Sequence, residues 1–143
     1  MQGELLCELK LKITDMLTIR VPEGIRFNVE VAGTVRGPKI SGTVKAIDYS
    51  LSHADGTALL HIHGVITTEE GDLIYVEASG FGTPTDQLGL SNVKEAVTLQ
   101  TASEKYAWLN TTLAVGEGHV DITPYTTIGE LYIKYFVPFT NNE

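Results

Sequence analysis

The side chains that could perform acid–base chemistry gather around one predicted hairpin. Asp55-Gly56 is typical of a two-residue type I′ turn, and β-branched runs flank it on both sides. If these two residues form the loop, Asp48 lies directly across from His63, with Cβ atoms about 4.5–5.5 Å apart. A carboxylate beside an imidazole fixes its tautomer and raises its basicity, so the pair could act as a general base in a partly dry cavity. We therefore predict Asp48 and His63 as catalytic residues.

The alternation of this hairpin leaves open which face points inward. One face carries Asp48, His61 and His63, and the other is apolar, with Ile47, Tyr49, Leu51, Leu60, Ile62 and Ile66. In a sheet with one solvated face, the polar side chains would face water and form no site. In a barrel with a polar hollow they would line the site, and the apolar face would pack on another subunit. Both interpretations stay open from the pattern alone.

The pair His61-Ile62-His63 also suggests a metal site, because residues i and i+2 of a strand project the same way. It resembles the His-x-His of cupin metal sites, which add a Glu shortly afterwards and a His on a later strand. Glu69 and His119 are the candidates for these positions. Glu69 falls in a predicted turn, and the Gly and Pro pattern around the last ligand is missing. We therefore expect no metal and keep a cupin-like protein as a less favoured alternative.

Further pocket candidates come from two other predicted strands. Tyr106, Trp108, Asn110 and Thr112 would share one face of a strand, where an aromatic wall and one amide could orient a ligand. Alternatively, Trp108 fills the core and Asn110 bonds to backbone. Glu77, which shares a strand face with Tyr75, is a weaker ligand-binding candidate.

The elements that must position these residues all read as strands separated by Gly, Pro or Asp-Gly turns. Eight or nine strands are predicted, over 5–13, 25–35, 40–50, 57–68, 73–81, 93–100, 106–115 and 130–137, with a short one at 119–122. Gly116-Glu117-Gly118 is predicted to interrupt the strands, residues 82–92 to form a rim or lid loop, and residues 139–143 to form a loose tail. Such a chain forms one antiparallel barrel or sandwich, and an eight-stranded barrel can hold one small ligand.

Size and charge limit the partners. The 143 residues suit one domain, spanning 1–143, and the formal net charge of −8 with scattered Lys and Arg disfavours nucleic acid and anionic membranes. No apolar run approaches the roughly 20 residues of a membrane helix.

Cys7 is the only cysteine, so it is expected in the core or an interface, and a reducing cytoplasm is the expected location. No glycine loop leads into a helix, so no nucleotide or other cofactor is expected.

Several motifs together resemble one family. They are Gly24-Ile25-Arg26, the segment 32–42 (AGTVRGPKISG), Ile47-Asp48-Tyr49, and Tyr106-Ala107-Trp108-Leu109-Asn110 followed by Val115-Gly116. This combination resembles the family catalogued as domain of unknown function 3237, over about residues 5–136. The resemblance implies a calycin-like (lipocalin-like) antiparallel barrel that often self-associates and has no determined activity.

The resemblance also places Arg26, Asp48, Trp108 and Asn110 among the family's recurrent polar or aromatic positions, which favours an Asp48 that faces the hollow. This chain departs from the family's pattern at two positions. Tyr49 replaces the usual Trp, and His63 stands where an Arg is expected.

Three hypotheses for function follow. The leading one is a barrel that binds a small, partly apolar organic molecule in its interior, with Arg26, His61, Glu77, Trp108 and Asn110 as ligand-binding residues. The alternative is a cofactor-free isomerase, cyclase or lyase, in which Asp48–His63 acts as base and Asn110 or Arg26 steadies an oxyanion. The third is a structural homo-oligomer assembled through the apolar face.

Overall fold

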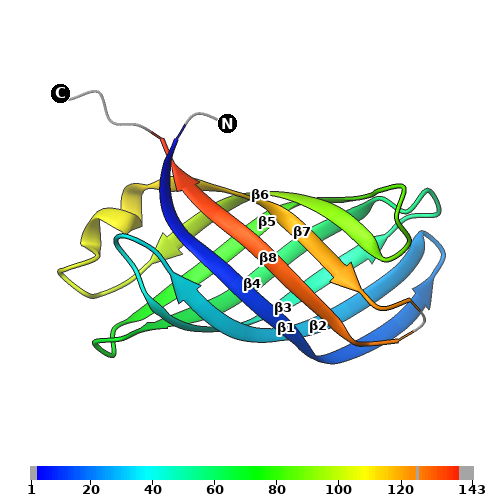
Figure 1. The fold of residues 1–143 in the computed structure, drawn as a ribbon, viewed down its shortest axis with the longest axis horizontal. Helices are drawn as coiled ribbons and strands as arrows, with labels where there is room; N and C mark the ends of the chain where they lie inside the picture. Colours follow the sequence, from blue (N-terminus) through cyan, green and yellow to red (C-terminus); the bar gives the residue numbers. More distant parts are fainter. Residues whose placement is uncertain (1–2, 125, 139–143) are drawn as a thin grey trace.

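Alternating apolar and polar residues give every strand of this protein one face for the interior and one for the surface. The computed structural model describes residues 3–124 and 126–138 and shows a closed barrel of eight antiparallel strands (Figure 1). The strands are β1 (Glu4–Val21), β2 (Gly24–Arg36), β3 (Gly42–Ser52), β4 (Ala58–Thr68), β5 (Leu73–Pro84), β6 (Leu90–Gln100), β7 (Leu113–Ile122) and β8 (Gly129–Val137). The predicted all-β fold is confirmed, and it is the barrel rather than the sandwich.

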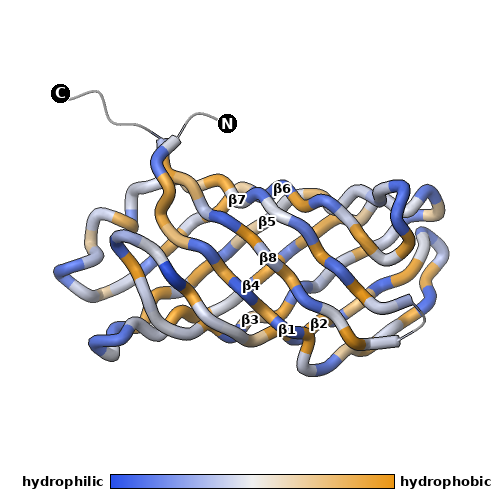
Figure 2. The backbone as a smooth tube through the Cα atoms, in the orientation of Figure 1, coloured by the Kyte–Doolittle hydropathy of each residue, from blue (hydrophilic) through white to orange (hydrophobic). Residues whose placement is uncertain are grey.

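The sheet is a simple meander that closes on itself. Each strand pairs with its neighbour in sequence, and β1 pairs with β8 to complete the circle. β1 has one register shift between Leu5 and Cys7, opposite β8, and another between Ile13 and Asp15, opposite β2. Beyond Lys12 it pairs with β2 alone, so the β1–β2 hairpin extends past β8. The hydropathy of the chain alternates along the strands (Figure 2).

One end of the barrel is packed and holds the hydrophobic core. This end carries the short 3-10 helix η1 (Ala107–Thr111) and both described chain ends (Figure 1). Leu109 of η1 and the adjacent Tyr106 are buried in the same cluster as Ile40, Ile66 and Leu99. The opposite end carries the β1–β2, β3–β4, β5–β6 and β7–β8 turns. Across the described part of the chain, no helix is long and apolar enough to cross a membrane.

Cys7 is buried in this core, in agreement with its predicted place. Burial, with a smaller contribution from Glu8, raises the pKa of the thiol to about 12. The thiol therefore stays protonated at neutral pH and is a poor nucleophile.

The predicted strand over 106–115 is wrong in its first half. Residues 107–111 form η1, which Asn110 holds in place. Its side-chain oxygen accepts a hydrogen bond from the Thr101 amide at 2.7 Å, and its amide nitrogen donates to the Thr101 carbonyl at 3.0 Å. These two hydrogen bonds hold together the connection formed by residues 101–112. Because Trp108 and Asn110 lie in the helix η1, they do not share a strand face.

The break predicted at 116–118 is also wrong, because both glycines lie within β7. They are there for close approach: a Cβ on Gly118 would lie 2.0 Å from the Tyr132 carbonyl oxygen, and one on Gly116 would lie 3.1 Å from the Tyr135 ring. The loop predicted at 82–92 shortens to 85–89, since β5 and β6 extend into it. The predicted tail, 139–143, lies outside the described residues.

Candidate functional site

The register of the β3–β4 hairpin differs by one residue from the prediction. Asp48 pairs with Ile62, and His63 pairs with Ile47. The turn contains three residues, not two: the amide of His53 donates to the Thr57 carbonyl and the amide of Gly56 donates to the His53 carbonyl, with Gly56 at φ +89°. The loop ends in a left-handed glycine, as is common in three-residue hairpin loops.

The slip separates the predicted catalytic pair. A shift of one residue moves a side chain to the other face of a sheet. Asp48 lines the barrel interior, whereas His61 and His63 lie on the outer surface. The prediction that Asp48 faces His63 is therefore wrong, while the expectation that Asp48 faces the hollow agrees with the structure.

The hollow is a cavity of about 380 Å³ whose walls are mainly aliphatic. It extends to the end of the barrel opposite η1, where Gly56 and Thr126 line it. Two carboxyl side chains of the described residues line it, Asp48 from β3 and Glu95 from β6. The volume is that of a site for a small organic molecule.

Glu95 occupies a position where the alternation of β6 calls for an apolar residue. It is in phase with Val93, Val97 and Leu99 and is only 3% exposed. Among the described residues, neither oxygen of its carboxyl group has a hydrogen-bond partner. Burial, and secondly the charge of Asp48, raise the pKa of Glu95 from 4.5 to about 7. The group is therefore a buried acid that titrates near neutral pH.

A glycine on the neighbouring strand β7 makes room for this carboxyl group. Glu95 pairs with Gly80 of β5 and with Gly116 of β7, and Gly116 in turn pairs with Tyr135 of β8. A Cβ on Gly116 would lie 3.1 Å from Oε2 of Glu95. The Glu95 and Tyr135 side chains thus converge over a strand that presents no side chain between them. Burial, and secondly Glu95, raise the pKa of Tyr135 well above its usual value, so the phenol stays neutral.

Asp48 is tied to the sheet by its own carboxylate. Its Oδ1 accepts a hydrogen bond of 3.1 Å from the backbone amide of His61, at a point where the β3–β4 ladder is interrupted between the Asp48/Ile62 and Leu51/Leu59 pairs. Burial raises the pKa of Asp48 to about 6, although the His61 amide and imidazole act in the opposite direction. Two carboxyl groups with pKa values near 6 and 7 can donate and accept protons at neutral pH.

Sequence reasoning missed Glu95, although a signal was available. In the run Val93-Lys94-Glu95-Ala96-Val97-Thr98-Leu99, the glutamate alternates in step with three apolar residues. An acidic residue at an inward position of an otherwise apolar strand face is rare and indicates a special role.

The other predicted ligand-binding residues lie away from the cavity. Arg26 is exposed on β2, next to the inward-facing Phe27. Trp108 is 40% exposed at the packed end, with the Lys39 ammonium 5.3 Å from its ring centroid. Asn110 is engaged with Thr101, as described above.

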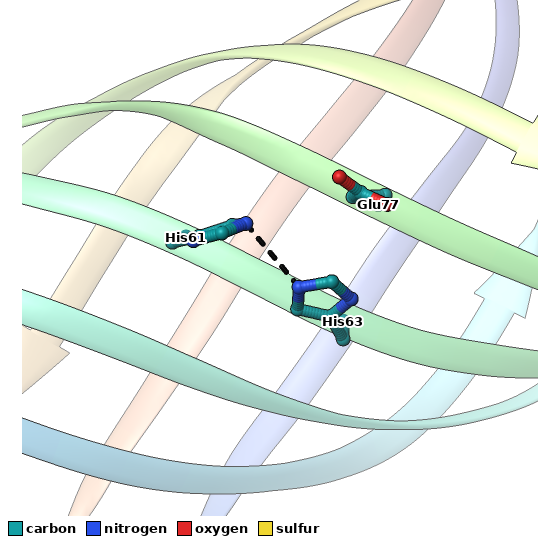
Figure 3. A group of neighbouring side chains, drawn as sticks. All are labelled: His61, His63 and Glu77. Atoms are coloured by element: carbon teal, nitrogen blue, oxygen red, sulfur yellow. Dashed lines mark hydrogen bonds between the residues drawn. The ribbon is translucent and has the colours of Figure 1, made fainter.

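His61 and Glu77 lie with His63 on the outer face of β4 and β5 (Figure 3). The cupin-like set is not brought together: Glu69 pairs with Arg36 at 3.4 Å, and His119 stacks on Tyr132 across β7 and β8. Neither residue belongs to the group around His61 and His63.

Solved structures share this barrel over nearly its whole length. A protein of unknown function from Clostridium acetobutylicum superposes with a TM-score of 0.82 at 22% identity, covering 97% of this chain and 100% of its own. A β-barrel-like protein from Acinetobacter baumannii gives 0.76 at 22% identity, covering 95% of each chain. A protein described as an enzyme, from Penicillium herquei, gives 0.62 at 25% identity, covering 94% of this chain and 96% of its own.

Sequence comparison agrees with the motifs that indicate a family. A search of curated proteins found no significant match. The profile described as "protein of unknown function (DUF3237)" matches residues 1–133. Because the match takes in all of β1 to β7 and part of β8, the chain belongs to the DUF3237 family.

Proposed function

We propose that the barrel binds a small, largely apolar organic molecule in its interior and holds the polar end of that molecule against Asp48 and Glu95. The observation that carries this proposal is the unpartnered Glu95 carboxyl group in an aliphatic cavity. A buried polar group without a partner costs about 1–3 kcal/mol, so a ligand that donates a hydrogen bond to Glu95 removes that penalty. The aliphatic walls supply affinity through burial, about 25 cal/mol per Å² before association costs.

Binding of a fluorescent probe tests this proposal. N-phenyl-1-naphthylamine is apolar and carries one N–H donor, so its fluorescence should rise when it enters the cavity. Leu60→Trp places a large ring inside the cavity and should abolish the rise, because Leu60 lines the wall. Leu59→Trp is the matched control, since Leu59 is 42% exposed. Equal binding by both variants would place the probe outside the barrel and contradict the proposal.

A cofactor-free acid–base enzyme is the second candidate, and the Asp48–Glu95 pair favours it. The alternative predicted from sequence, an isomerase, cyclase or lyase, then keeps Asp48 and takes Glu95 in place of His63. In an isomerisation, the Asp48–Glu95 pair alone accounts for every proton that moves. The ionised carboxylate removes a proton from one carbon or oxygen of the substrate, and the protonated carboxyl group returns a proton to another atom of the substrate. The Penicillium herquei protein described as an enzyme supports a barrel of this shape as a catalyst.

Proton exchange separates an enzyme from a binder. α-Tetralone is an apolar ketone with slowly exchanging protons next to its carbonyl, and the wild-type protein in D₂O should accelerate deuterium uptake there, measured by NMR. Asp48→Asn and Glu95→Gln should both lose the acceleration, while the probe still binds to Asp48→Asn. Uptake at the same rate in all three proteins would exclude general base catalysis of this ketone and leave binding as the function.

The predicted cytoplasmic location and homo-oligomer stay predictions. Light scattering on the full chain measures the second of these directly.

A further inference from the structure

A second group of chemically active side chains lies on the outside of the barrel, across the sheet from the cavity. His61 and His63 project from β4, and Glu77 lies directly opposite His63 on β5 (Figure 3). The nearest ligand atoms of the three residues all lie within 4.8 Å of one another. This arrangement needs only a flat pair of antiparallel strands, because i, i+2 and cross-strand neighbours share one face.

The two imidazoles are spaced as ligands of one metal ion. Nε2 of His61 and Nε2 of His63 are 3.2 Å apart. Two nitrogens bound to one Zn²⁺ at about 2.0–2.1 Å with a tetrahedral angle are separated by about 3.3 Å. A cation between the rings would therefore replace the His61–His63 hydrogen bond with little movement of either side chain.

Tyr75 orients one of these rings in the way that metal sites require. Its hydroxyl lies 2.5 Å from Nδ1 of His63. When Nδ1–H donates to the Tyr75 oxygen, the lone pair of His63 Nε2 points toward His61 and is free to coordinate. A ligating histidine usually donates its other N–H to a second group, which fixes the tautomer and raises the basicity of the ligand.

We propose that His61, His63 and Glu77 bind one divalent transition-metal ion of the Zn²⁺ type, with a fourth position open to solvent. Two imidazoles and one carboxylate are the donor set of three-ligand zinc sites. The expected absence of a metal followed from a mismatch with the cupin pattern. Here Glu77 supplies the carboxylate from the neighbouring strand, so neither Glu69 nor His119 is needed. The net charge of −8 favours the approach of a cation.

Calorimetric titration of untagged, EDTA-treated and dialysed full-length protein with Zn²⁺ tests this site. We expect saturation at one Zn²⁺ per chain, and a loss of that binding in both His61→Gln and His63→Gln. His119→Gln is the matched control, since His119 is an exposed strand histidine outside the group, and it should bind as the wild type does. Tyr75→Phe keeps all three ligands and should weaken binding about tenfold.

Two further measurements make the outcome decisive. Co²⁺ bound in place of Zn²⁺ should show the intense visible absorption of a four-coordinate ion, and this absorption should be missing in His63→Gln. Glu95→Gln should keep full Zn²⁺ affinity, because the metal lies outside the cavity. The proposal is overturned if the wild type shows no saturable binding, if His63→Gln binds as tightly as the wild type, or if His119→Gln lowers affinity as much as His63→Gln. Circular dichroism confirms that each variant is folded, and all substituted residues lie on the outer face or retain their size.

Discussion

The buried carboxyl group of Glu95 makes the stability of this barrel depend on pH in an unusual direction. In the folded protein its pKa is raised from 4.5 to about 7. An acid whose folded pKa is higher than its unfolded pKa stays protonated in the folded state while the unfolded chain already releases its proton. Raising the pH from the unfolded pKa to the folded pKa therefore favours unfolding.

The magnitude follows from the two pKa values. The difference between 4.5 and about 7, at roughly 1.4 kcal/mol for each pKa unit, gives about 3 kcal/mol. Glu95 is 3% exposed, so solvent screening reduces this value little. The free energy of unfolding of the wild type should therefore fall by about 3 kcal/mol, because of this one group, as the pH rises through the window between these pKa values.

The substitution Glu95→Gln isolates this effect. The amide keeps the size of the side chain but does not titrate. The free-energy cost of burying the amide is therefore the same at every pH and adds no pH dependence of its own. Urea unfolding of both proteins at several pH values from about 4 to 8 gives the difference in unfolding free energy. That difference should move by about 3 kcal/mol in favour of Glu95→Gln as the pH rises. Glu130→Gln, an exposed substitution of the same chemistry, should show no such movement.

Neighbouring titratable groups do not hide the pH dependence of the difference in unfolding free energy between the wild type and Glu95→Gln. Among the described residues, the titratable groups whose charges act on Glu95 or respond to it are Asp48, whose pKa is raised to about 6, and Tyr135, whose pKa is raised well above its usual value. Asp48 titrates in both proteins, so its contribution largely cancels in the difference. Tyr135 stays neutral throughout the range. Unfolding curves whose difference is constant from about pH 4 to pH 8 would refute a buried, unpartnered Glu95.

Three further predictions concern packing. Leu109→Ala should lower the free energy of unfolding by about 2–5 kcal/mol because Leu109 is fully buried at the packed end. Trp108→Ala should lower it by only about 1 kcal/mol, because Trp108 is 40% exposed. Chemical denaturation measures both values, and equal values would contradict the placement of η1. Gly116→Ala should destabilise the fold by about 1–3 kcal/mol, since its Cβ would crowd Glu95 and Tyr135, and an unchanged midpoint would mean that the glycine makes no room. Gly56→Ala should cost about 1–2 kcal/mol because of its φ of +89°, and Gly71→Ala, at φ +94° with nothing within 4 Å, should cost about the same if backbone strain dominates. A much smaller cost at Gly71 would instead assign the effect to the contact of Gly56 with Pro84.

Strand alternation predicted most of this fold because it reports directly on burial. It did not predict η1, because Tyr106, Trp108 and Asn110 suggested strand alternation, whereas the buried residues, Tyr106 and Leu109, are three apart, which is the spacing of a 3-10 turn. The glycines of β7 were misleading for a similar reason. Close approach to β8 and a chain break use the same residue type, and only the neighbouring strand distinguishes them.

The candidate site depended on a detail that local sequence leaves open. Asp55-Gly56 suits a two-residue turn, but it also suits a three-residue loop that ends in a left-handed glycine. The two loops differ by one residue in register, which exchanges the inner and outer faces of one strand relative to the other. Asp48 therefore lines the hollow together with Glu95, and His63 lies opposite Glu77 on the outer face. Two separate groups replace the single site that was predicted.

The closure of the meander has a consequence for how the chain folds. Seven of the eight strand pairings join sequence neighbours, all but β6–β7 through short connections, and they can form early and one after another. The eighth joins Glu4–Lys12 to Glu130–Val137, from opposite ends of the chain. A chain in which the other seven pairings have formed but this seam has not would expose two unpaired strand edges, and such edges can pair with other molecules. Removing either terminal strand would leave two such edges permanently open, one on each of its former partners, so aggregation during refolding should rise steeply in chains truncated at either end.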